Sequence, residues 1–342
     1  MTDLVDPDLT GGDGTDPVAH LEPDRFSLSP VLEVSERTSP LRRLKHLWEF
    51  RELLVNLTRK ELKVKYKNSI LGFVWSLLNP LLYLLIFGVV FGVILGSQVQ
   101  DYAIFMLSGL LAWNFFSAGL GGGCGAIVDN SSLVTKVWFP RETLVLASVG
   151  AALVHFFLQS TVLLAAMVIV GREPSFKFLP ALPLAMVDLV ILTAALAIAL
   201  SAINVYLRDT QHLLELVLLA WFWGTAIVYP YFTIVTRFGA GREWMASLNP
   251  LLPIVLTFQR VLYNPTEAEQ TAVKVIPGVK ASPAARGTVS PTTIPLHARV
   301  LPNHDLNWYV TRLGLVGIMS VVLLYFALVL FSRLEGNFAE EI

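Results

Sequence analysis

The chain has 342 residues, of which 54% are hydrophobic and 15% are charged, and its mean hydropathy is +0.62. A typical soluble domain has about 25% charged residues because its surface must face water, so this composition excludes an ordinary soluble protein and indicates one embedded in lipid. The formal net charge of -1 averages an acidic N-terminal segment with a basic segment after it. The single cysteine, Cys124, excludes an intrachain disulfide and is expected to be a small packing residue.

The N-terminal segment is acidic and rich in Pro, Gly and Asp. Its first 36 residues contain nine acidic residues and one basic residue, Arg25, and they lack an apolar run, so the pattern is not that of a signal peptide. This composition predicts a disordered acidic cytoplasmic tail over residues 1–38. A single membrane domain is expected to follow at 39–342.

Residues 41–67 form a basic segment with nine Lys or Arg against three acidic residues. Apolar residues recur in it at helical spacing: Leu44, Leu47, Phe50, Leu54 and Leu57. This pattern predicts an amphipathic helix. Because a membrane span follows at once, we expect the helix to lie in the interface, with its apolar face in lipid and its cations near anionic head groups. The alternative is a soluble packing helix.

The rest of the chain is dominated by long apolar stretches. A helix needs about 20 apolar residues to cross a bilayer, and six stretches qualify: about 71–95, 102–128, 143–170, 179–205, 213–235 and 308–331. The apolar segment 250–263 is too short to cross and predicts a re-entrant or interfacial segment before the last span. Residues 264–306, rich in Pro, Thr and Ala, predict a long external loop. The predicted fold class is an all-α membrane protein.

The distribution of Lys and Arg predicts the orientation. The basic segment before the first span places the N-terminus in the cytoplasm, and six spans return the C-terminus there. The loop 129–142, with Lys136 and Arg141, then faces the cytoplasm. Arg172 and Lys177 lie outside in this topology and do not decide the orientation. We therefore expect a multi-pass protein of the cytoplasmic membrane.

The sequence contains none of the common catalytic or nucleotide-binding motifs. It has no Gly-x-x-x-x-Gly-Lys-Ser/Thr phosphate-binding loop, no Gly-x-Ser-x-Gly, no His-Glu-x-x-His, and no Cys/His cluster with metal-ligand spacing. We therefore expect no catalytic residues, no metal, no cofactor and no nucleic-acid partner for this chain.

Polar residues inside the predicted spans are candidates for function, because they are costly in lipid. His155 and Gln159 lie one helical turn apart on one face of the third span, and Asp188 lies in the fourth. A proton-coupled carrier would use such groups as a relay. The alternative is hydrogen bonding between helices, which is common in membrane proteins.

Glycines and aromatic residues are also clustered. Five glycines between positions 119 and 125 indicate either close helix packing or a hinge. Aromatic residues recur in the second and fifth spans, where they either line a passage for sugars, whose C–H faces stack on rings, or pack between helices. These candidate channel residues are Trp113, Phe116, Trp221, Trp223 and Tyr229.

Four runs resemble permeases of polysaccharide-exporting ABC transporters, such as exporters of O-antigen, teichoic acid or actinobacterial galactan. The run KYKNSILGFVWSLLNP at 65–80 resembles the start of their first span. NSSLVTKVWFPRE at 130–142, NVYLRDT at 204–210 and LNP at 248–250 follow in the family's order. The acidic tail and the long loop before the last span depart from the family's pattern.

The resemblance implies a homodimer of permeases that forms a channel for a lipid-linked polysaccharide, for which cell-wall galactan is one candidate. Two copies of a separate soluble subunit would bind ATP and Mg²⁺. A coupling helix in the loop 129–141 would contact that ATPase through Asn130, Ser131, Leu133, Lys136, Phe139, Pro140 and Arg141. The segment 250–263 would act as an external gate, whose residues include Asn249, Pro250 and Pro253.

Other functions remain open on the sequence. An ABC permease for drugs or lipids shares the six spans but usually lacks the run at 68–75. A proton-coupled carrier would need His155 and no ATPase. A membrane glycosyltransferase would need an acidic catalytic pair on one side of the membrane, and the sequence shows no convincing pair.

Overall fold

The computed structural model describes residues 47–67, 74–94, 99–231, 233, 248–265, 300–302 and 304–341. Within these ranges the regular elements are all helices. The predicted acidic tail, residues 41–46 of the predicted amphipathic helix and most of the predicted external loop lie outside the described residues. The described chain thus has the all-α architecture that its apolar stretches predict.

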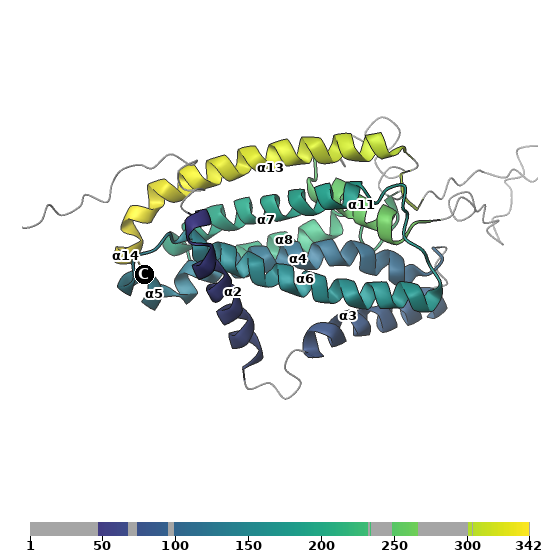
Figure 1. Cartoon of the computed structure of the whole chain (residues 1–342), viewed down its shortest axis with the longest axis horizontal. Helices are drawn as coiled ribbons and strands as arrows, with labels where there is room; N and C mark the ends of the chain where they lie inside the picture. The colour runs from purple at the N-terminus through teal and green to yellow at the C-terminus, as the bar shows by residue number, and fades with distance from the viewer. Residues whose placement is uncertain are drawn as a thin grey trace, which may run out of the picture. The chain divides into compact units, whose positions relative to one another are not determined.

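Four long helices lie side by side in the described part of residues 39–342 (Figure 1). α4 packs against α6 and α7, and α7 packs against α13. Each is long and apolar enough to cross a membrane, so four of the six predicted spans are confirmed as helices of that length. Their bounds are Tyr102–Asp129 for α4, Glu142–Val170 for α6, Ala181–Tyr206 for α7 and Leu306–Leu334 for α13.

The first and fifth predicted spans appear as shorter helices. α3 covers Val74–Phe87, contains Pro80, and passes directly into a π-helix, η2, at Gly88–Ile94. α8 covers Thr210–Trp223 and ends at Gly224, after which the chain turns. Pro and Gly weaken a helix, and neither effect registers in an average of hydropathy. The predicted apolar runs are therefore present, but only in part as continuous α-helix.

α2, at Arg51–Tyr66, is the described part of the predicted amphipathic helix, and none of its residues is fully buried. It packs against α6. The contact is close at Gly150 of α6, where an added Cβ would lie 2.9 Å from the Thr58 hydroxyl oxygen. The Tyr66 hydroxyl lies 3.1 Å from Nδ1 of His155, also on α6. α2 is thus held to the bundle by a small residue and a polar pair.

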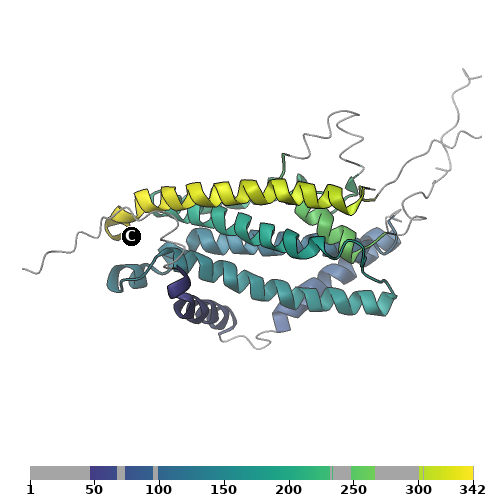
Figure 2. The same cartoon turned by 45° about the horizontal axis from the view of Figure 1, so that its top comes forward.

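The long helices give the molecule two ends. At the α5 end lie α5 (Ser131–Lys136), the end of α7, η3 (Glu335–Asn337) and α14 (Phe338–Glu341). There the Tyr206 hydroxyl donates to the Leu334 carbonyl at 2.7 Å, and the Phe338 ring is buried. At the opposite, α11 end lies α11 (Leu251–Leu262), packed on α4, α7 and α13. Figure 2 shows the same arrangement from a second side.

Two glycines of α4 permit the close approach of its neighbours. A Cβ on Gly123 would lie 2.7 Å from Cβ of Ala197, and one on Gly119 would lie 2.8 Å from Cγ2 of Thr193. Both partners belong to α7. Gly121, in contrast, has nothing within 4 Å of such a position. Close packing of α4 on α7 therefore requires Gly119 and Gly123 but not Gly121.

We expect Gly123→Ala to be less stable than Gly121→Ala by about 1–3 kcal/mol, because overpacking in a tight contact costs that much. Both variants gain the same helix propensity, so their difference isolates the packing cost. The free energies of unfolding can be compared by chemical denaturation in detergent. Equal stability of the two variants would show that α4 and α7 are not packed as described.

Candidate functional site

The loop between α4 and α6 contains the short helix α5 at the place where the resemblance implies a coupling helix. Asn130 precedes it, and its side-chain nitrogen donates to the Ala126 carbonyl at 2.9 Å. Its side-chain oxygen accepts from Nζ of Lys60 on α2 at 2.7 Å. The side chain of Asn130 therefore does not cap α5. Instead it ties the start of α5 to both α4 and α2.

The predicted coupling residues divide into exposed and anchored groups. Lys136 is exposed, whereas Ser131, Leu133 and Phe139 are partly buried, and the last two pack against the apolar core. Two further residues, Val137 and Trp138, are 54% and 74% exposed. Sequence reasoning did not single these two out, although an apolar pair inside a polar loop was visible. They make the exposed apolar tip of the α5 loop.

Arg141 anchors the loop to the C-terminal part of the chain. Its Nη1 donates to the Glu335 carbonyl at 2.7 Å, and its guanidinium lies 5.7 Å from the centroid of the Phe338 ring. The resemblance placed Arg141 among the residues that touch a partner. In the structure its contacts join the start of α6 to the turns after α13.

Three of the five predicted channel aromatics, Trp113, Phe116 and Trp221, lie at the contact between α4 and α8, whereas Tyr229 follows α8. The Trp113 ring of α4 lies 5.4 Å from Phe222, and Phe116 lies 5.2 Å from Trp221, both with edge-to-face geometry. Phe116 is fully buried, whereas Trp223 is 57% exposed. Most of these rings therefore pack the α4–α8 contact, and Trp223 faces outward.

A cavity of about 380 Å³ lies between α3, α4 and α8, and Trp113 is one of its walls. Other rings around it come from Tyr83, Phe87 and Phe222. Its polar side chains are those of Asn114, Ser117 and Glu215. The cavity thus combines aromatic faces with a few polar groups, as small-molecule sites in general do.

The candidate relay residues His155 and Gln159 each bond to a different helix. Oε1 of Gln159 accepts from Asn114 of α4 at 3.0 Å, and the His155 ring meets Tyr66 of α2. Asp188 is buried between α7 and α13, where an added Cβ on Gly317 would lie 2.7 Å from its Oδ1. The contacts of His155 and Gln159 fit hydrogen bonding between helices, which was the alternative to a relay.

The predicted gate segment coincides with α11, which is buried almost throughout. Asn249 precedes it, and both the oxygen and the nitrogen of its side-chain amide form hydrogen bonds. Its oxygen accepts from Nε1 of Trp221 at 2.9 Å and from the Leu251 amide at 3.0 Å. Its nitrogen donates to the Thr225 hydroxyl at 2.9 Å. Asn249 thereby joins the first turn of α11 to the aromatic cluster and the end of α8, whereas Pro250 and Pro253 lie in that first turn.

The sequence was compared with known proteins. Residues 52–263 match the family described as ABC-2 type transporter, a range that runs from α2 through α11. The O-antigen export system permease protein RfbA of Myxococcus xanthus is 35% identical over 224 residues, which cover 66% of this chain and 85% of the relative. RfbA of Klebsiella pneumoniae is 30% identical over 213 residues, covering 62% and 81%. The polysialic acid transport protein KpsM of Escherichia coli is 25% identical over 203 residues, covering 57% and 75%.

We expect Asn249→Ala to lower the free energy of unfolding by about 1–3 kcal/mol, because partners of the lost amide remain partly buried without it. Asn307→Ala is the matched control, since Asn307 is exposed at the start of α13. Thermal unfolding in detergent compares the two. If Asn249→Ala were as stable as Asn307→Ala, Asn249 would not hold α11 to α8.

Proposed function

The chain belongs to the ABC-2 type transporter family, and we propose that it is the permease subunit of an exporter that moves polysaccharide out of the cell. The observation that carries this proposal is the similarity to an O-antigen export permease. The two sequences are 35% identical over a stretch that covers 85% of that relative. A second relative is named for transport of polysialic acid, a different glycan. Glycans are thus what these relatives have in common, and this favours a polysaccharide over a drug or a simple lipid as the cargo.

The proposed topology has six spans, with α3 and α8 completing the set. The helical segment from Val74 to Ile94 has 21 residues, which at 1.5 Å per residue extends about 30 Å, the thickness of the hydrocarbon core. α8 is shorter, and its path is completed by the turns after Gly224. α11 is then a re-entrant segment, buried in protein as non-spanning segments at membrane depth must be.

The proposed orientation places the α5 end in the cytoplasm. α2 carries several Lys and Arg, and Lys136, Arg141 and Arg333 belong to the same end. Cationic segments next to spans are retained in the cytoplasm. At the opposite end, Arg172 is paired with Asp101, so its charge is compensated there. The proposed location is therefore the cytoplasmic membrane, with both ends of the described chain inside.

The proposed power source is ATP hydrolysed by a separate subunit, which would hold ATP and Mg²⁺. This subunit would dock on the exposed tip of the α5 loop, where Val137 and Trp138 offer an apolar contact and Lys136 a charge. ATP can drive transport only if the partner binds one state of the permease better than another. The hydrogen bonds from this loop to α2, α4 and the turns after α13 would transmit a change at the docking surface to the helical bundle.

The proposed channel forms between two copies of the chain. α8 exposes a row of large apolar residues, among them Leu213, Leu216 and Leu219, to which either lipid or a second copy is complementary. The aromatic cavity lies beside this face, between α3, α4 and α8. Sugar rings can stack on its aromatic walls while the lipid carrier of the glycan remains in contact with the bilayer. Cell-wall galactan is one polysaccharide that this arrangement would suit.

We expect Lys136→Ala combined with Trp138→Ala to abolish glycan export while leaving the permease in the membrane. Both side chains are exposed, and Trp138 has one ring contact, with Phe50 at 6.4 Å, so most of the cost falls on docking with the ATPase. Export is measured as glycan that appears on the cell surface. Docking is measured as the amount of ATPase subunit that co-purifies with the permease.

The matched control is Ser132→Ala, which removes an exposed hydroxyl of α5 without changing the apolar tip. It should export as the unaltered chain does. Full export by the Lys136→Ala, Trp138→Ala variant would show that this loop does not couple the permease to an ATPase. Export that persists without any ATPase, but fails in His155→Ala, would instead support a proton-coupled carrier.

A further inference from the structure

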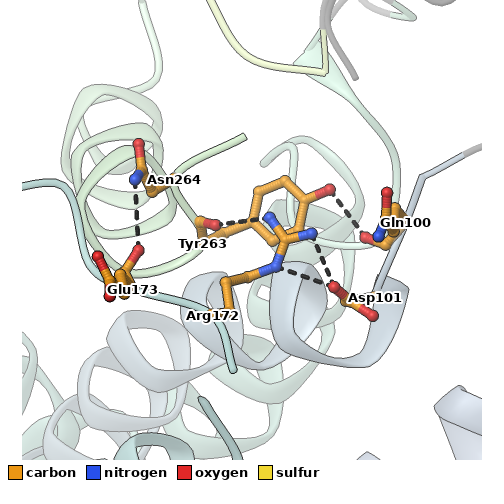
Figure 3. A network of polar contacts seen from close by, with 6 residues as sticks. All are labelled: Gln100, Asp101, Arg172, Glu173, Tyr263 and Asn264. Atoms are coloured by element: carbon orange, nitrogen blue, oxygen red, sulfur yellow. Dashed lines mark hydrogen bonds and ion pairs between the residues drawn. The ribbon is translucent and has the colours of Figure 1, made fainter. Parts of the chain in front are cut away.

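Arg172, which follows α6 directly, makes a set of contacts that no step of the proposed mechanism uses (Figure 3). Its Nε and Nη2 donate to Oδ2 of Asp101 at 3.0 and 2.7 Å. Its Nη1 donates to the Tyr263 carbonyl at 3.0 Å, and the guanidinium lies 4.4 Å from the centroid of the Tyr263 ring. One side chain therefore joins the start of α4, the end of α6 and the residue after α11.

Other hydrogen bonds close these three segments into a ring. The Tyr263 hydroxyl donates to the Gln100 carbonyl at 2.8 Å, and the Asn264 side chain donates to the Glu173 carbonyl at 3.3 Å (Figure 3). The Ser175 amide donates to the carbonyl of Val261 at 2.8 Å. Each segment is thus bonded to another at more than one point. We call this group the Arg172 ring: residues 100–101, 172–175 and 261–264.

The backbone is shaped to bring these groups together. Asp101 and Asn264 have φ of 47° and 43°, in the left-handed region that residues other than glycine rarely adopt. Gly171, with φ of 77°, turns the chain out of α6 immediately before Arg172. Asp and Asn adopt this region more readily than other non-glycine residues, and here their side chains bond to Arg172 and to the Glu173 carbonyl. The ring therefore has a defined geometry and is not a chance meeting of surface charges.

The chemistry of the ring requires arginine. The Arg172 side chain is 9% exposed and that of Asp101 is 27% exposed, so water screens this pair little. The guanidinium of arginine is planar and carries several N–H donors. It can bond to a carboxylate and a carbonyl at once while its flat face stacks on an aromatic side chain. Lysine keeps the charge but lacks the fork and the flat face. Arg172→Lys therefore separates the geometry of the ring from its charge.

The ring also holds the end of α11 that is opposite to Asn249. Asn249 connects the start of α11 to α8, whereas Tyr263 connects its far end to α4 and α6 through Arg172. α4 and α6 are the two helices that flank α5. A displacement that begins at the α5 loop therefore reaches both helices to which the far end of α11 is fastened.

We propose that Arg172 is a positioning residue for α11: it fastens the far end of α11 to α4 and α6, so that the three segments move as one body when the transporter changes state. The proposal deepens the proposed function, because it assigns to Arg172 the coupling between the α5 loop and the external gate. Without the ring, α4 and α6 still respond to the ATPase, but α11 no longer follows them. ATP is then hydrolysed without a matching amount of glycan released.

The test measures glycan exported per ATP hydrolysed, in vesicles that contain the permease and its ATPase subunit. Arg172→Lys and Asp101→Asn should each lower this ratio at least about fivefold, the lower range of an energetic coupling between sites. ATP hydrolysis should stay within about twofold of the unaltered complex. The double variant should be no worse than either single variant, because both changes break the same contact.

Tyr263→Phe is a milder variant that removes only the hydroxyl bonded to Gln100. It should also lower the ratio of glycan exported per ATP hydrolysed. It therefore still tests the proposal if either of the stronger variants fails to fold. Lys177→Gln is the matched control, because Lys177 lies in the same α6–α7 loop and its side chain is 68% exposed. It should leave the ratio unchanged.

The outcomes separate this inference from the proposed function. If the unaltered complex exports glycan and Arg172→Lys and Tyr263→Phe keep the full ratio, the positioning role of Arg172 is wrong while the exporter remains. Loss of ATP hydrolysis and of glycan export in equal proportion would also contradict the positioning role, because it would mark the ring as support for the fold alone. If the unaltered complex moves no glycan, the proposed function itself fails.

Discussion

A bilayer offers no water to the backbone, so a chain that crosses it must satisfy its amides and carbonyls internally. The four long helices meet this demand by themselves. The described residues that follow α8 meet it partly through side chains, since Asn249 donates to the Gly224 carbonyl at 3.1 Å and Gln259 donates to the Ala226 carbonyl at 3.0 Å. Non-helical backbone thus occurs here where protein groups surround it. The same demand explains why α11 begins beside Trp221 and not in open lipid.

Groups of polar contacts fasten both ends of the described bundle, and mostly apolar packing lies between them, together with the hydrogen bonds of His155 and Gln159. At the α5 end, Asn130 and Arg141 fasten the α5 loop to α2 and to the turns after α13. At the α11 end, Arg172 fastens three loops together. Between these ends, Gly119 and Gly123 let α4 and α7 approach closely. A closely packed bundle changes between discrete arrangements more readily than it bends, so a force applied at one end has a route to the other.

Apolar length and charge predict much of this architecture from the sequence. They predict the four long helices and the buried segment at α11, and the resemblance indicates where α5 lies. They do not predict that α8 stops at Gly224 or that α3 passes into a π-helix, because hydropathy reports composition and not the hydrogen-bond pattern of the backbone. The aromatic residues were recognised by type, but which ones are buried depends on the packing of α4 against α8.

The Arg172 ring shows what escapes sequence reasoning altogether. By sequence alone, Arg172 is one of two cations on the outer side of the membrane, and it does not decide the predicted orientation of the chain. Its partners Asp101 and Tyr263 are 71 and 91 residues away, and neither spacing nor charge points to them. Contacts at such separations are visible only once the helices are placed, because the topology, not the local pattern, brings the three loops to one end.

We propose that this chain moves polysaccharide only together with an ATPase. The most direct test is transfer of a radiolabelled lipid-linked glycan into inverted vesicles that contain the purified chain, with and without the ATPase subunit. Glycan should enter the vesicles only when the subunit and hydrolysable ATP are both present. Transfer driven by a proton gradient without the subunit, or no glycan transfer under any condition, would contradict it.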